Sequence, residues 1–164
     1  MPTIWSASIS GTPSTSVRGR AIRVCEGEAA SGTGMRTPRQ RSGDAAETLV
    51  AGLLTARGWR VLARNVHAGR SELDIVAVDP GPPGRLVVVE VRWRASRSFG
   101  GPEESFDHRK RAQLRIGVGR LLESGRLPDG SPLPRLPVAV DLAVVEPGPA
   151  GRHSARLYRN ALGE

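Results

Sequence analysis

Apolar residues are concentrated in two short runs on either side of a turn. Residues 72–79 read Glu-Leu-Asp-Ile-Val-Ala-Val-Asp, residues 85–92 read Arg-Leu-Val-Val-Val-Glu-Val-Arg, and Pro-Gly-Pro-Pro-Gly lies between them. Runs of β-branched residues bounded by proline and glycine are typical of strands joined by a turn. The pattern therefore predicts a β-hairpin over residues 72–92.

Two other stretches have helical spacing. Apolar residues recur at intervals of three and four over residues 44–57, and Gly58 follows where a helix would end. The same spacing covers residues 108–124, directly after Asp107, a residue type that favours the N-cap position. We expect one helix before the hairpin and one after it.

The remaining pattern completes an α/β fold. Further short strands are expected over residues 59–64, 138–145 and 152–158, with a loop over residues 65–71. The resulting order is α-β-β-β-α-β-β. A hairpin joined through a helix to another strand predicts a mixed sheet with helices on its faces, an α/β sandwich.

Residues 1–41 lack this periodicity. They are rich in Ser, Thr, Gly and Arg, which predicts disorder and places the folded domain at 42–164. Met35 directly precedes that domain, and we expect translation to start there. Apolar runs are far shorter than the ~20 residues of a membrane-spanning helix, and no apolar signal region precedes the domain. A cytoplasmic location without membrane partners is expected.

Two carboxylates interrupt the apolar runs of the hairpin. Asp74 and Glu90 stand where a charged side chain is costly to bury unless it is paired or bound to a metal. With the turn centred on Pro82, antiparallel pairing sets Asp74 opposite Glu90 and Glu72 opposite Arg92, with Cβ atoms roughly 5 Å apart. A bulge in the turn would instead put the carboxylates on opposite faces.

Two opposed carboxylates repel each other, and a shared proton, a nearby cation or a bound metal relieves the repulsion. Oxygen ligands without Cys or His suit Mg²⁺ or Mn²⁺ better than zinc. The alternative is that Asp74 and Glu90 pair with arginines on a solvated face of the sheet. Three acidic groups and one basic group on the same face favour the metal, and no small-molecule cofactor is indicated.

The chain carries a net charge of +8 and a sequence pI of about 11.3, and Lys110 is its only lysine. An excess of positive charge favours polyanionic partners. Drift in base composition would explain arginine in place of lysine, but it does not explain the surplus of basic residues. Acidic residues that converge within a basic protein are what metal-dependent chemistry on nucleic acids requires.

Basic residues cluster after the hairpin. The loop that follows it carries Trp93 and Phe99 among arginines, and such residues can contact phosphates and stack on bases, although Phe99 could equally anchor the loop to the core. The candidate nucleic-acid-binding residues are Arg94, Arg97, Arg109, Lys110, Arg111 and Arg115.

These segments resemble a known family. The runs that carry the resemblance are Ser71-Glu72-Leu73-Asp74-Ile75-Val76-Ala77, Val88-Val89-Glu90-Val91-Arg92, Phe99-Gly100-Gly101-Pro102-Glu103-Glu104, and Lys110. Together they resemble the YraN family of small, uncharacterised, endonuclease-like bacterial proteins, over about residues 42–160. The resemblance implies the PD-(D/E)XK superfamily, a restriction-endonuclease-like αβββαβ core and kinship to archaeal Holliday-junction resolvases.

The resemblance also implies roles for individual residues. Asp74 and Glu90 would hold the metal, Glu47 on the first helix would be an accessory acid, and Glu72 a supporting one. From spacing alone, Glu47 is better explained as a solvated residue of the first helical turn. The superfamily pattern has lysine two residues after the glutamate, where this chain has Arg92. Arginine stays protonated and supplies only charge and hydrogen bonds.

Two further residues bear on the site. Lys110, which is part of the resemblance, lies on the second helix with a supporting role left open, and Gln113 departs from the family pattern because arginine would be expected there in relatives. The leading hypothesis is an Mg²⁺- or Mn²⁺-dependent endonuclease for branched DNA, in which Arg92 stabilises charge on the reacting phosphate. Its rival is a non-catalytic DNA-binding module in which Arg92 pairs with Glu72 or Asp74. A role in protein interaction stays open, and a homodimer is compatible with each hypothesis.

Overall fold

The computed structural model describes residues 6–9, 38–94, 107–147 and 153–163. In chain order the elements are β1 (Ser6–Ile9), α1 (Pro38–Ala56), β2 (Arg60–Ala68), β3 (Ser71–Asp79), β4 (Arg85–Trp93), α2 (His108–Ser124), β5 (Val138–Pro147) and β6 (His153–Tyr158).

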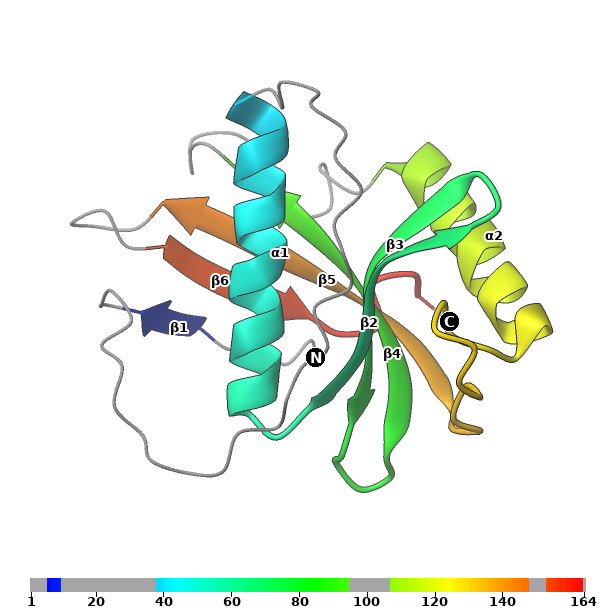
Figure 1. Ribbon diagram of the computed structural model, residues 1–164. Coiled ribbons are helices and arrows are strands. Elements are labelled where there is room, and N and C mark those ends of the chain that lie inside the picture. Colours follow the sequence, from blue (N-terminus) through cyan, green and yellow to red (C-terminus); the bar gives the residue numbers. More distant parts are fainter. Residues whose placement is uncertain (1–5, 10–37, 95–106, 148–152, 164) are drawn as a thin grey trace.

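The strands form one mixed sheet in the order β1-β6-β5-β4-β3-β2, which α1 and α2 cover from opposite faces (Figure 1). Strands β4 and β5 are parallel, and the other neighbours are antiparallel. The segment from α1 to β5 has the order α-β-β-β-α-β, so the α/β class and the restriction-endonuclease-like core are confirmed.

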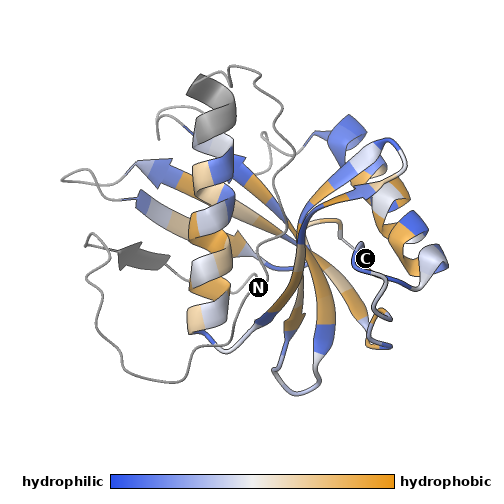
Figure 2. Cartoon of the chain, in the orientation of Figure 1, coloured by the Kyte–Doolittle hydropathy of each residue, from blue (hydrophilic) through white to orange (hydrophobic). Residues whose placement is uncertain are grey.

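Apolar side chains fill both sides of the sheet. Leu54 of α1 packs with Ile75 and Val89 on one face, and Leu114 of α2 packs with Val88 on the other. Figure 2 shows the apolar stretches of the central strands continuing beneath both helices. A strand that is buried on both faces needs apolar residues at successive positions, which explains the valine run of β4.

The β3–β4 hairpin has the predicted register. Asp79 pairs with Arg85 at the turn, and the ladder continues to Ile75 opposite Val89 without a bulge. One position beyond this last pair, Asp74 of β3 and Glu90 of β4 lie at the same level of the sheet. The ladder between β3 and β4 ends before this level, so the sheet forks there.

The prediction of a loop over residues 65–71 was wrong. Strand β2 continues to Ala68 and forms a second tight hairpin with β3, in which Val66 pairs with Leu73. Val66 and Ala68 are buried and alternate with exposed neighbours, which is the pattern of a half-buried strand. Gly69 makes the turn possible with a φ of 66°.

Two expectations about the N-terminal region also need correction. Helix α1 begins at Pro38 rather than near residue 44, in keeping with the preference of proline for the first helical turn. Ser6–Ile9, expected to be disordered, form strand β1 along β6. Met35 lies outside the described residues, so the proposed start is an open prediction. No helix in the described part of the chain is long and apolar enough to span a membrane.

Candidate active site

The site lies where β3 separates from β4. The main-chain N–H of Val91 donates a hydrogen bond to Oδ2 of Asp74 at 2.7 Å. A side-chain oxygen of β3 thus accepts the bond that a main-chain carbonyl would take in a continuous ladder. This contact holds the carboxylate of Asp74 against β4, next to Glu90.

Glu90 is buried with two cations on one of its oxygens. The side chain is 2% exposed, and Oε1 lies 3.0 Å from Nζ of Lys110 and 3.2 Å from a guanidinium nitrogen of Arg92. Oε2 is also buried and has no hydrogen-bond partner. An unpaired oxygen of a buried carboxylate is costly, and a bound cation is one way to satisfy it.

Helix α2 delivers Lys110 to this carboxylate. Asp107 caps the helix by accepting a hydrogen bond from the main-chain N–H of Lys110 at 2.7 Å. The cap fixes the first turn of the helix and therefore the origin of the lysine side chain. Lys110, whose role the sequence left open, is thus part of the site.

The carboxylates make ionisation expensive for one another. Burial, with the charge of Asp74 as the next cause, raises the pKa of Glu90 to about 7 against the opposing effect of Lys110 and Arg92. Burial also raises the pKa of Asp74, although the hydrogen bond from Val91 and the charge of Lys110 lower it in part. Perturbed carboxyl groups of this kind are characteristic of functional sites.

Glu47 approaches the site from α1. Its carboxylate lies 3.7 Å from the guanidinium of Arg64, which also donates to the hydroxyl of Thr48 at 3.0 Å. Burial raises the pKa of Glu47, and the neighbouring Asp74 adds to the effect. Glu47 and Glu72 line an open polar hollow of about 650 Å³ between α1 and the β2–β3 hairpin.

The acidic groups do not form a closed metal cage. Among the described residues, no three Asp, Glu, His or Cys side chains lie close enough together to hold a metal ion. The sequence predicts three converging acids, but Glu72 is exposed, and the β3–β4 ladder ends at Ile75 and Val89, before the predicted pair of Glu72 with Arg92. Arg92 contacts Glu90, not Glu72 or Asp74.

Asp74 and Glu90 nevertheless suit one kind of metal. Mg²⁺ keeps several waters and is commonly bound through one or two carboxylates together with substrate phosphates. The unpaired Oε2 of Glu90 and the acidic oxygens of Asp74 match this ligand set. They do not match a closed tetrahedral zinc site.

The predicted nucleic-acid-binding residues are spread over two elements. Arg94 follows β4 and donates its main-chain N–H to Val145 at 2.9 Å. On α2, Arg109 is exposed near Lys110, while Arg115 donates to the carbonyl of Leu162 at 2.7 Å. Arg111 also lies on the first turns of α2. Arg97 and Phe99 lie outside the described residues.

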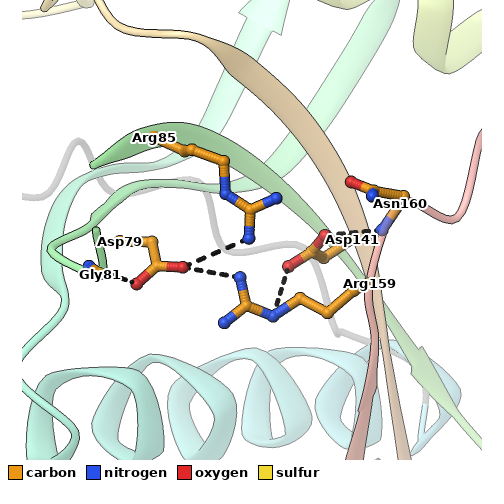
Figure 3. Close-up of polar contacts among 6 residues, drawn as sticks. All are labelled: Asp79, Gly81, Arg85, Asp141, Arg159 and Asn160. Atoms are coloured by element: carbon orange, nitrogen blue, oxygen red, sulfur yellow. Dashed lines mark hydrogen bonds and ion pairs between the residues drawn. The ribbon is translucent and has the colours of Figure 1, made fainter. Parts of the chain in front are cut away.

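The sequence analysis did not predict a second group of charged residues, whose two carboxylates are buried. It joins Asp79, Arg85, Asp141 and Arg159 on the face of the sheet that α1 covers (Figure 3). Arg159 donates to Asp79 at 2.6 Å and lies 3.7 Å from Asp141, and its guanidinium is 5.0 Å from the ring centre of Trp59. Asp141 interrupts an apolar strand just as Glu90 does, so the same rule would have found it.

Asp79 and Glu90 differ in how their charges are satisfied, whereas Asp141 resembles Glu90 in having a pKa that burial raises and a buried oxygen without a hydrogen-bond partner. Burial alone would raise the pKa of Asp79, but the hydrogen bonds from Arg159 and from the main chain of Gly81 outweigh it and lower that pKa. Arg85 adds a further contact at 3.5 Å. Asp79 is thus stabilised as a charged group, whereas the pKa of Glu90 is raised. We interpret the group around Arg159 as structural and the site at Glu90 as functional.

Comparisons with known proteins match the part of the chain that contains the candidate site. A family model described as "Uncharacterised protein family UPF0102" matches residues 46–143, a range that contains Asp74, Glu90 and Lys110. A UPF0102 protein of Symbiobacterium thermophilum is 42% identical over 123 residues, which cover 75% of this chain and 97% of the relative. One of Bordetella petrii is 37% identical over 134 residues, or 81% of this chain and 80% of the relative.

Proposed function

This chain belongs to the uncharacterised protein family UPF0102, and we propose that it is a nucleic-acid-binding protein that hydrolyses DNA phosphodiester bonds with Mg²⁺ or Mn²⁺. The observation that carries the proposal is the pair of carboxyl groups at the fork between β3 and β4, of which Glu90 is buried and Asp74 half-buried. Asp74 and Glu90 meet there beside two cationic side chains, and one oxygen of Glu90 is unpaired.

Each residue has a defined task in this proposal. Asp74 and Glu90 bind the metal, and the metal, when bound, lowers the pKa of a water and neutralises charge on the phosphate. Arg92 and Lys110 are partly exposed, with 34% and 28% of their side chains accessible, so each can also reach a phosphate oxygen. They stabilise negative charge that develops on the phosphate.

Lys110 and Arg92 reach the same carboxylate from different elements. Lys110 approaches Glu90 from α2, at 3.0 Å, and Arg92 contacts it from β4, at 3.2 Å. An arginine stays protonated and supplies only charge and hydrogen bonds. We assign electrostatic stabilisation of the reacting phosphate to both cations.

The surface charge supports a polyanionic substrate. A net charge of +8 attracts phosphate from a distance, and the paired carboxylates would repel it unless a cation intervened. The proposed metal therefore also reconciles an acidic site with an acidic substrate. A preference for branched DNA is part of the proposal and follows from the family resemblance.

A second candidate is a DNA-binding module without catalysis. The observation that favours it is that Glu90 already has two cationic partners, Arg92 and Lys110, so its charge is balanced without a metal. In this alternative the protein retains its basic surface, and the carboxylates only hold the fork of the sheet together.

Cleavage assays with defined DNA substrates separate the two candidates. Purified protein is incubated with junction, flap and linear DNA in Mg²⁺, Mn²⁺ or EDTA. We expect cleavage with metal by the wild type and by Asp129→Asn, an exposed loop variant with the same change in charge, but not by Asp74→Asn. DNA affinity of Asp74→Asn should be unchanged or higher, because a negative charge near the phosphate is removed.

Two outcomes would contradict the proposal. Equal cleavage by the wild type and Asp74→Asn would indicate a contaminating nuclease. Metal-independent DNA binding without cleavage of any substrate would support the non-catalytic module.

A further inference from the structure

A basic groove lies between the edge strand β2 and the C-terminal end of α2. It encloses about 470 Å³, and its charged or titratable lining residues are Arg64, His67, Arg120 and Arg126. The lining that the structure describes contains no acidic side chain. None of these residues was among the nucleic-acid-binding candidates suggested by the sequence.

Arg120 and Arg126 are exposed and held in place by main-chain contacts, whereas the exposed Arg64 contacts the side chains of Glu47 and Thr48. The guanidinium of Arg120 lies over the turn at Gly69, where a Cβ atom would collide with it, and donates to the carbonyl of Ala68 at 3.5 Å. Arg126 donates to the carbonyl of Gly130 at 2.9 Å. A guanidinium has five N–H donors, so most of them are available to a ligand.

The groove and the polar hollow beside Glu47 meet at the edge strand β2. Arg64 and Asn65 line both this groove and the polar hollow that contains Glu47. Along α2, Arg120 lies ten residues after Lys110, a distance of about 15 Å at 1.5 Å per residue. Neighbouring phosphates of one DNA strand are about 3.4 Å apart along the helix axis, so this distance corresponds to roughly four or five nucleotides.

We propose that the groove between β2 and α2 binds the sugar-phosphate backbone of a duplex DNA arm that extends beyond the cleavage site. The inference rests on the proposed function and adds the path of the substrate across the protein. Arg120 and Arg126 contact phosphates on the arm, and Arg64 stands where the arm meets the hollow beside Glu47. Such contacts position a duplex without reading its bases.

Salt-dependent binding to two lengths of DNA tests this path. Affinity is measured by fluorescence anisotropy in EDTA for hairpin DNAs with stems of about 3 base pairs, which span only ~10 Å, and of about 18 base pairs. The wild type is compared with Arg120→Ala/Arg126→Ala and with a matched control, Arg57→Ala/Arg135→Ala, which removes two exposed arginines outside the groove. Arg120→Lys/Arg126→Lys serves as the rescue variant, because it keeps both charges.

For the long stem, loss of two phosphate contacts should make the slope of log affinity against log salt shallower by about 2 in the groove variant. The short stem does not reach the groove, so its slope should be unchanged. The control and rescue variants should match the wild type on both stems. Melting temperatures verify that all variants are folded.

The possible failures are distinguishable. An unchanged slope on the long stem, or an equal loss on both stems, would overturn the groove while leaving the proposed cleavage function standing. If the wild type bound neither stem, the proposed function itself would fail. A loss that also appeared in Arg120→Lys/Arg126→Lys would show that charge is not the cause and would overturn the inference.

Discussion

Replacement of Glu90 by glutamine should make the metal-free protein more stable at neutral and alkaline pH. The Glu90 side chain is 2% exposed and faces the charge of Asp74, so its ionised form is costly even beside Lys110 and Arg92. Glutamine has nearly the same shape and no charge. Residues that a function requires are often unfavourable for stability, and Glu90→Gln tests whether this is one of them.

The size of the effect follows from the pKa of Glu90. A carboxyl group whose pKa is raised on folding contributes stability below its unfolded pKa, and that stability is lost as the pH rises through its folded pKa. A rise from the ordinary value of 4.5 to about 7 corresponds to a loss of about 3 kcal/mol by pH 8. Lys110 and Arg92 lose a partner in the variant, so we expect a net gain of about 1–3 kcal/mol.

Urea denaturation in EDTA between pH 5 and pH 8 measures this gain. The wild type should lose stability across that range relative to Glu90→Gln, and the two should converge towards pH 5. Asp79→Asn is the matched control, because the pKa of Asp79 is lowered by Arg159 and its neutral replacement should destabilise the protein. If Glu90→Gln were less stable than the wild type by the same amount at every pH, the carboxylate would be a structural partner of its cations.

Three other predictions follow from the same contacts. Arg159→Ala should lower the free energy of unfolding by about 1.5–3 kcal/mol, because Asp79 loses its shortest charge-assisted hydrogen bond and keeps only Arg85 as a cationic partner, and this deficit should shrink in acid as Asp79 becomes protonated; urea titrations at pH 7 and pH 3 measure it. Arg92→Lys should preserve cleavage, whereas Arg92→Ala and Lys110→Ala should each slow it on the order of 10²-fold in single-turnover assays; wild-type rates for both alanine variants would remove these residues from the mechanism. Mg²⁺ at about 100 times its dissociation constant should stabilise the wild type by about 2.7 kcal/mol but leave the melting temperature of Asp74→Asn unchanged, and an equal response of the two proteins would exclude Asp74 as a ligand.

Local patterns in the sequence determined most of the core and one half of the site. The β-branched runs and the proline-glycine turn determined the β3–β4 hairpin and its register, because strand alternation and turn length are local properties. The same register brought Asp74 and Glu90 together. The cost of burying a charge was enough to mark Glu90 within its run of valines.

The strand propensities of individual residues predicted the structure less well where polar residues alternate with small apolar ones. The predicted loop included residues 65–68, yet Val66 and Ala68 are buried beneath α2. Pairing with β3 gives this segment its strand conformation. The neighbouring strand supplies that pairing, and the polar-apolar alternation of residues 65–68 was the signal in the sequence that favoured a strand.

The partners of the buried charges were decided only by the tertiary structure. Lys110 follows Glu90 by twenty residues and reaches it because α2 docks with its capped first turn at the fork of the sheet. Arg159 reaches Asp79 and Asp141 from beyond the end of β6. The sequence determines which charges must be compensated, because desolvation is a property of each buried group. Which cation compensates them depends on how distant elements pack, because an ion pair requires contact within a few ångströms.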